Sequence, residues 1–199
     1  MIMLVTRLEQ VNKRKCRVYL NDEPAFLLYY HEIEEYHIRE GQELSDAMRQ
    51  ELTNQILGKR AKIRCIDLLQ ISDKTEQELI RKLHQEEYPE KVIREALDYV
   101  KSYHYVDDFH YARNYIDSRK EGKSRQQISY ELLGKGIRSD LIQQAWEETE
   151  LVDPTALILR WAEKKQYDPQ CADERERRKF YQFLLRKGFL FSDIKKALT

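Results

Sequence analysis

Two segments combine histidines with carboxylates and are the first candidates for metal or acid–base chemistry. Residues 31–37 and 104–110 each hold two histidines beside acidic residues. Neither has the histidine pair at i and i+4 with a glutamate between that binds zinc on a helix, and Asp107 is better explained as the N-cap of a helix that begins at Asp108. The sequence also lacks a glycine-rich phosphate loop and a nucleophile elbow. We therefore predict no catalytic residue, no metal and no cofactor.

Clustered basic residues favour a different chemistry, which is contact with phosphate groups. Lys120, Lys123 and Arg125 flank a glycine turn at an expected helix start, where free backbone N–H groups also attract phosphate. Such contacts position a protein on nucleic acid without reading its sequence. The candidate DNA- or filament-binding residues are Arg113, Arg119, Lys120, Lys123, Arg125, Lys135, Arg138, Arg175, Arg177, Arg178, Lys179, Arg186 and Lys187.

The alternative reading of these residues is a solvated helix face on which acids neutralise bases. Arg113 with Asp117 and Arg177 with Asp173 have the spacing of such ion pairs. The aromatic residues between 103 and 115 are similarly open to two interpretations. They could stack on nucleic-acid bases, but positions 109, 112 and 116 follow helical spacing, which favours packing between short helices.

The net charge of the chain hides strongly opposed blocks. The 199 residues contain 35 Lys+Arg and 35 Asp+Glu, a formal charge of zero. Residues 1–19, 113–138 and 160–187 each carry a net charge of +4, whereas residues 21–46 carry −7 and residues 139–153 carry −5. This pattern excludes a uniformly basic DNA coat and fits a protein that contacts both a polyanion and a mixed protein surface.

Cysteine usage and hydropathy indicate a cytoplasmic protein. Cys16, Cys65 and Cys171 are odd in number and far apart, which is typical of reduced thiols. No apolar run approaches the roughly 20 residues that span a bilayer, and the first residues lack the pattern of a signal peptide. We expect a cytoplasmic monomer.

The elements that position these residues change after the first thirty positions. Alternating apolar residues at 16, 18 and 20, bounded by polar turns, predict a strand within a small N-terminal β-meander. From about residue 45 onward the chain predicts short helices. Thr75 with Glu78 and Ser124 with Gln127 have the spacing of capping boxes. Further expected boundaries are Asp153-Pro154 at a helix start and Gly136 and Gly188 at helix ends.

An internal repeat of about 50 residues organises this helical part. Shifting the segment 75–97 by 49 residues superposes its apolar positions on 124–146, and a shift of 52 relates the second copy to the third. Repeats of this size usually stack into an elongated array. We predict a mainly α protein, a tandem array of three three-helix repeats with helix-turn-helix-like pairs and a small N-terminal β-hairpin or meander. The expected boundaries are 1–44, 45–99, 100–150 and 151–199.

The second copy resembles the central repeat of the RecX family. The resemblance lies in Tyr105-Val106-Asp107-Asp108, Ser118-Arg119, Gly122-Lys123 and Lys135-Gly136-Ile137, and the similarity extends from about residue 38 to the end. It implies a non-enzymatic regulator that binds the RecA recombinase filament and, weakly and without sequence preference, single-stranded DNA. It further implies inhibition of recombinase and ATPase activities in DNA repair, recombination and the SOS response.

The first copy departs from the family pattern in its turn, and two other functions remain open for the chain. The first copy has Glu86-Glu87-Tyr88 where the others have Lys-Gly and an apolar residue, so we expect its turn to differ, because glutamate costs more than glycine in a left-handed conformation. A general helical-repeat scaffold without nucleic-acid contact is the main alternative function. A duplex-binding regulator is less favoured, since the chain has no dimerisation element.

Overall fold

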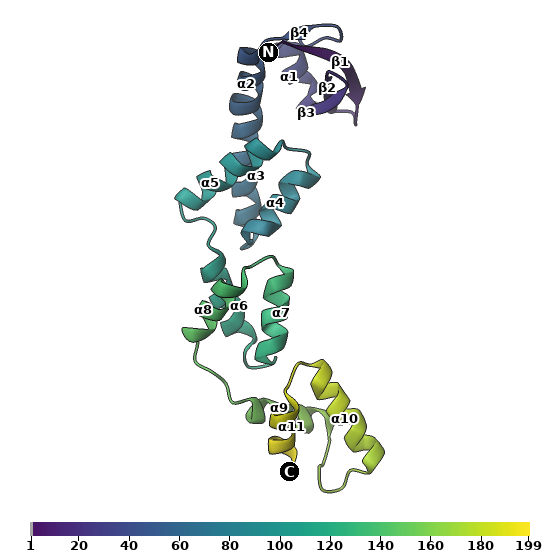
Figure 1. Cartoon of the computed structure of the whole chain (residues 1–199), viewed down its shortest axis with the longest axis vertical. Helices are drawn as coiled ribbons and strands as arrows, with labels where there is room; N and C mark the ends of the chain where they lie inside the picture. The colour runs from purple at the N-terminus through teal and green to yellow at the C-terminus, as the bar shows by residue number, and fades with distance from the viewer. Residues whose placement is uncertain (1) are drawn as a thin grey trace. The chain divides into compact units, whose positions relative to one another are not determined.

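The predicted N-terminal meander is present and gains a fourth strand. The computed structural model describes residues 2–199 (Figure 1). The antiparallel sheet has the order β3-β2-β1-β4, formed by β1 (Met3–Gln10), β2 (Lys15–Leu20), β3 (Glu23–Tyr29) and β4 (Glu43–Leu44). Cys16, Val18 and Leu20 of β2 are buried, as their alternation predicts. The short helix α1 (Tyr30–Glu35), which follows β3, was not predicted.

The sheet shares one hydrophobic core with the first helical copy. The helical part that follows the sheet begins with α2 (Asp46–Glu51), the π-helical segment η1 (Leu52–Leu57) and α3 (Gly58–Ile71). It continues with α4 (Glu76–Gln85) and α5 (Glu90–Ser102). The shared core includes Val5 and Leu28 from the sheet and Ile93 from α5. Arg60 of α3 also donates to both carboxylate oxygens of Glu32, at 3.0 and 3.1 Å, which fixes α1 against α3.

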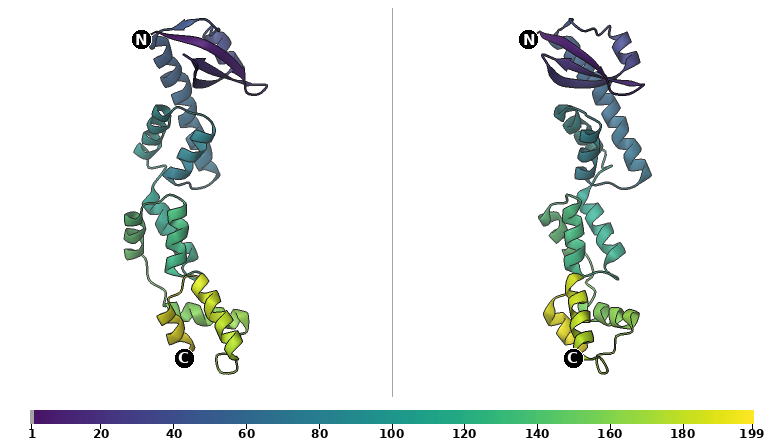
Figure 2. Two further views of the ribbon diagram at one scale, coloured as in Figure 1. Left: turned by 45° about the vertical axis from the view of Figure 1, so that its right-hand side comes forward. Right: turned by 90° about the vertical axis from the view of Figure 1, so that its right-hand side faces the viewer.

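The chain divides into two compact units, and the second unit begins at Asp107. The second copy consists of α6 (Asp108–Arg119), α7 (Arg125–Gly134) and α8 (Ser139–Glu147), and the third of α9 (Pro154–Lys165), α10 (Glu174–Arg186) and α11 (Phe191–Leu198). Each has its own small core, and in both views of Figure 2 its three helices lie together. The mainly helical fold class with tandem three-helix copies is therefore confirmed, while the exact boundaries between copies stay a prediction.

The helix starts follow the capping residues read from the sequence. Thr75 and Glu78 form the full reciprocal box, with bonds of 3.2 and 3.1 Å. Ser124 forms half of its box, because it accepts from the backbone N–H of Gln127 at 3.2 Å while the Gln127 side chain turns to Glu131. Asp107 and Asp153 cap α6 and α9, which confirms both predictions.

The first copy makes the same left-handed turn as the other two, so the expectation of a different turn is wrong. Glu87, Gly136 and Gly188 have φ of 60°, 88° and 79°. In each copy the next residue donates its backbone N–H to a carbonyl in the last turn of the preceding helix, five residues back, at 3.1 to 3.2 Å. This is the bonding of a Schellman-type helix end.

Ion pairs within the first unit explain why glutamate is tolerated in this turn. A non-glycine residue in the left-handed region costs about 1–2 kcal/mol. The Glu87 carboxylate receives a two-pronged bond from Arg17 of β2, at 2.6 and 2.8 Å, which offsets part of that cost. The Arg17 bond also holds the pKa of Glu87 below its ordinary value. Glu86 pairs with Arg64 of α3 at 2.7 Å, so both acids tie the turn to its surroundings.

Candidate interface on the second unit

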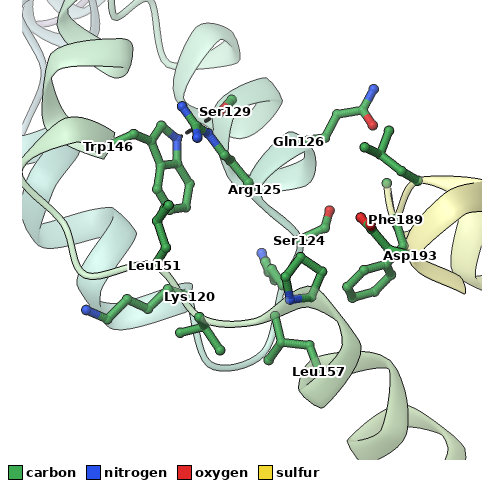
Figure 3. Close-up of a pocket in the computed structure, with 15 residues that line it drawn as sticks. Lys120, Ser124, Arg125, Gln126, Ser129, Trp146, Leu151, Leu157, Phe189 and Asp193 are labelled. Atoms are coloured by element: carbon green, nitrogen blue, oxygen red, sulfur yellow. Dashed lines mark hydrogen bonds between the residues drawn. The ribbon is translucent and has the colours of Figure 1, made fainter. Parts of the chain in front are cut away.

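A cavity of about 600 Å³ opens between the second and third copies (Figure 3). Trp146 and Leu151 lie on one side and Phe189 on the other. Leu151 and Leu190 belong to the lining and are 63% and 60% exposed. The charged residues that line the cavity are Lys120, Lys123, Arg125 and Asp193. The cavity is therefore an apolar hole with a mainly basic border.

The joint beside this cavity depends on a serine and a glycine. The Ser124 hydroxyl, which caps α7, donates to the carbonyl oxygen of Lys187 at 2.6 Å and so links the two copies. A Cβ atom on Gly188 would lie 2.7 Å from the Ser124 Oγ and 3.3 Å from the backbone nitrogen of Gln127. Position 188 therefore requires glycine both for its left-handed backbone and for the close approach of the copies.

Two of the three basic residues predicted as a phosphate cluster already have carboxylate partners. Lys123 Nζ lies 2.6 and 2.7 Å from the two oxygens of Glu131. Lys120 Nζ lies 2.9 Å from Asp117, and this hydrogen bond raises the pKa of Lys120. The Arg125 guanidinium instead lies 5.3 Å from the centre of the Trp146 ring. Arg125 is the member of the cluster that offers an unneutralised cation at the cavity.

The ion pairs expected for Arg113 and Arg177 are wrong. Arg113 lies 3.8 Å from Glu148, and Asp117 pairs with Lys120, the residue that follows α6. Asp173 instead caps α10, accepting from the backbone N–H of Glu176 at 2.7 Å. The capping box of Asp173 with Glu176 is visible as a sequence pattern, but the ion-pair interpretation concealed it.

The remaining candidate residues fall into three groups. Arg138 is paired with Asp140, and Arg178 with Glu174 at 3.1 Å. Three lie over aromatic rings: Arg119 over Tyr115, Lys135 over Tyr111 and Lys187 over Trp161, at 5.3 to 5.4 Å. Within residues 2–199, the last group forms no ion pair: Arg175, Arg177, Lys179 and Arg186.

The aromatic residues near the start of α6 divide between packing and exposure. Phe109, Tyr111 and Tyr115 pack against the core of the second copy, which confirms the packing interpretation for them. Tyr103 and Tyr105 are 56% and 53% exposed and stack on each other at 5.6 Å, so packing between helices is wrong for these two.

The apolar lining of the cavity has no signature in the sequence. The repeat comparison placed Trp146 opposite Leu97 as a core position, and both are indeed buried. No pattern distinguishes a core position that also faces a cavity. Across residues 2–199 no three metal-ligating side chains come together, and no helix there is long and apolar enough to cross a membrane.

The fold defines a tandem three-helix-repeat protein with an N-terminal sheet, and comparisons identify its family. Models described as the first, second and third three-helix domains of RecX match residues 61–99, 107–145 and 153–198. A "Regulatory protein RecX" of Caldanaerobacter subterraneus subsp. tengcongensis is 30% identical over 199 residues, 99% of each chain. That of Clostridium tetani is 26% identical, over 98% of this chain and 93% of its own. The chain belongs to the RecX family.

Two solved structures share the fold. A crystal structure of regulatory protein RecX covers 98% of both chains with a TM-score of 0.65 and 23% identity. RecX from Lactobacillus salivarius covers 71% of this chain and 94% of its own, with a TM-score of 0.58 and 20% identity. At these identities the likeness supports the fold alone.

Proposed function

We propose that this protein binds the filament that RecA recombinase forms on single-stranded DNA and inhibits its recombinase and ATPase activities. The observation that carries the proposal is the match over 99% of both chains to a relative called a regulatory protein. In this proposal it acts as a cytoplasmic monomer in DNA repair and recombination, including the SOS response. It has no catalytic residue of its own.

The cavity between the second and third copies supplies the protein contact in this proposal. Exposed leucines around an apolar hole are typical of an interface that receives a partner's side chain. Arg125 at the border has no carboxylate partner among residues 2–199 and would pair with an acidic residue next to that side chain. The recombinase segment that docks here is therefore apolar with a neighbouring acid.

The DNA contact is proposed for the basic candidates whose charge is not neutralised within the fold. Paired residues such as Lys123 and Arg178 contribute less, because their ion pairs must break before they reach a phosphate. The DNA-facing candidates are Arg119, Arg175, Arg177, Lys179, Arg186 and Lys187. Contacts from these side chains would be weak and independent of sequence.

Co-sedimentation with RecA filaments on single-stranded DNA tests the proposal. The wild type is expected to sediment with the filament and slow strand exchange, and Arg125→Glu to lose at least tenfold in inhibition. Arg94→Glu is the matched control and is expected to keep full inhibition, because Arg94 is an exposed helix arginine outside the candidate binding residues and undergoes the same charge change. Reversing Lys123 instead would place two glutamates together and disturb the fold. A wild-type protein that stays in the supernatant would refute the proposal.

A scaffold that binds a protein without nucleic acid is the second candidate, and the apolar cavity favours it equally. Binding to recombinase that carries no DNA separates the two. Undiminished affinity for the DNA-free recombinase, with no added affinity for the filament, would support the scaffold.

A further inference from the structure

Three lysines of the third copy surround two aromatic rings. Trp161 of α9 and Phe183 of α10 meet edge to face, with ring centres 5.3 Å apart. The Nζ atoms of Lys164 and Lys187 lie 5.1 and 5.3 Å from the Trp161 ring. Those of Lys165 and Lys187 lie 5.3 and 5.8 Å from the Phe183 ring. We call these five residues the lysine–aromatic cluster.

The charge of this cluster is not neutralised by the protein. Within residues 2–199, Lys164, Lys165 and Lys187 form no ion pair with a carboxylate. Three ammonium groups gathered on two rings repel one another, and the ring faces attract them without carrying a formal charge that would neutralise them. An anionic partner bound among the three ammonium groups would relieve their mutual repulsion.

Comparison with the second copy shows a carboxylate that the third copy lacks. With the shift of 52 residues, Lys135 corresponds to Lys187, and Glu131 to Phe183. In the second copy Glu131 binds Lys123 and accepts a hydrogen bond from Tyr115 at 2.8 Å. In the third copy phenylalanine removes that carboxylate and adds a ring. The third copy therefore has an aromatic ring where the second copy has a carboxylate that neutralises a lysine.

The chemistry of the cluster matches single-stranded nucleic acid. A single strand alternates phosphates with flat bases, and proteins bind it with cations and aromatic platforms together. Trp161 and Phe183 are only partly buried and lie among the cations. A paired duplex keeps its bases stacked inside and offers them to no ring, and a carboxylate-bearing peptide uses the lysines alone.

We propose that the lysine–aromatic cluster is a single-stranded nucleic-acid site, with phosphates on Lys164, Lys165 and Lys187 and a base against Trp161. The proposal deepens the proposed function, since it places the DNA contact of the filament regulator on the third copy. It rests on the unneutralised charge and the rings, and its test needs no recombinase.

The two tryptophans of the chain allow a direct test by fluorescence. Trp146→Phe leaves Trp161 as the only tryptophan, and Trp161→Phe leaves the buried Trp146. Titration with oligo(dT) is expected to quench Trp161 and to leave Trp146 unchanged, with circular dichroism confirming the fold of both variants. Absence of quenching in the Trp146→Phe variant would overturn the base contact. Equal quenching by inorganic polyphosphate would also overturn it, because that polymer has no bases.

The charge contribution is tested with a matched pair of variants. Lys164→Glu/Lys165→Glu should weaken oligo(dT) binding at least tenfold. Loss of two phosphate contacts should reduce the slope of log affinity against log salt by about 1.4. Lys195→Glu/Lys196→Glu is the control, since these adjacent lysines of α11 are also exposed and undergo the same charge change. If both double variants weakened oligo(dT) binding equally, the loss would be explained by net charge alone, and the proposed site would be overturned.

The outcome is separable from that of the proposed function. If oligo(dT) binds elsewhere but the protein still sediments with the filament, this site is wrong and the filament proposal stands. If oligo(dT) binds as expected and the filament is not bound, the site is supported and the filament proposal fails.

Discussion

Replacing Gly188 with alanine tests the joint between the second and third copies. The new Cβ would lie 2.7 Å from the Ser124 Oγ, and the backbone has φ of +79°. The left-handed backbone costs about 1–2 kcal/mol for alanine. Overpacking adds about 1–3 kcal/mol. The free energy of unfolding of the second unit should therefore fall by about 2–5 kcal/mol.

Urea unfolding followed by tryptophan fluorescence measures this loss, because both tryptophans belong to the second unit. Ser124→Gly removes the hydroxyl at a cost of a few tenths of a kcal/mol for the cap and about 0.5–1.5 kcal/mol for the bond to Lys187. In that background Gly188→Ala meets no hydroxyl, and only the 3.3 Å approach to the Gln127 nitrogen remains. Its cost should therefore fall toward the backbone contribution of about 1–2 kcal/mol. The double variant should thus be more stable than the two separate losses predict.

Gly41→Ala serves as the backbone control. Gly41 has φ of +81°, and nothing lies within 4 Å of a Cβ built on it. Circular dichroism should show a loss of only about 1–2 kcal/mol for this variant. Effects of Ser124→Gly and Gly188→Ala that add within about 0.5 kcal/mol would refute the contact between the copies.

Three further predictions concern groups elsewhere in the fold. Glu87→Ala and Glu87→Gly both lose the bond to Arg17, but only alanine keeps the strain of the left-handed backbone. Thermal unfolding should therefore show Glu87→Ala less stable than Glu87→Gly by about 1 kcal/mol. Equal stabilities would contradict the shared turn. Arg17 depresses the pKa of Glu87 in the folded protein, so the stabilisation by this ion pair is present above the ordinary glutamate pKa and is lost as the pH falls through the folded pKa. The urea midpoint of Glu87→Gln should therefore decline less on acidification than that of the wild type. In a thiol-reagent assay the exposed Cys171 should react in the native protein. Burial raises the pKa of Cys65 to about 11, so Cys65 should react only on unfolding. Asp168→Asn should speed the reaction at Cys171, because the hydrogen bond with Asp168 raises the pKa of that thiol.

Local patterns predicted most of the fold. Thr75, Asp107 and Asp153 cap helices because a short polar side chain satisfies free N–H groups next to it in the chain, which a sequence shows directly. Gly136 and Gly188 end helices for an equally local reason. The turn at Glu87 was misjudged because the bond that supports it comes from Arg17, 70 residues earlier in the chain.

The candidate site was less predictable, because charge in a sequence does not show which cations are already paired. Lys123 and Lys187 each lie beside a glycine, yet Glu131 pairs with the first, and within residues 2–199 no carboxylate pairs with the second. The repeat alignment contained the relevant difference, at Glu131 and Phe183, but its meaning needed the side-chain geometry. The cavity depends on how two copies meet, which no periodicity encodes.

The core shared by the sheet and the first copy has a consequence for how this chain can be recombined with its relatives. Arg17 and Arg60 cross from one part to the other, and apolar residues from both fill the same interior. A chimera joined near residue 44 would separate these partners and mismatch a buried surface. A crossover between Val106 and Asp107, where one compact unit gives way to the next, leaves both interiors whole. The unit that can be exchanged between relatives at the start of the chain is therefore the sheet together with the first three-helix copy.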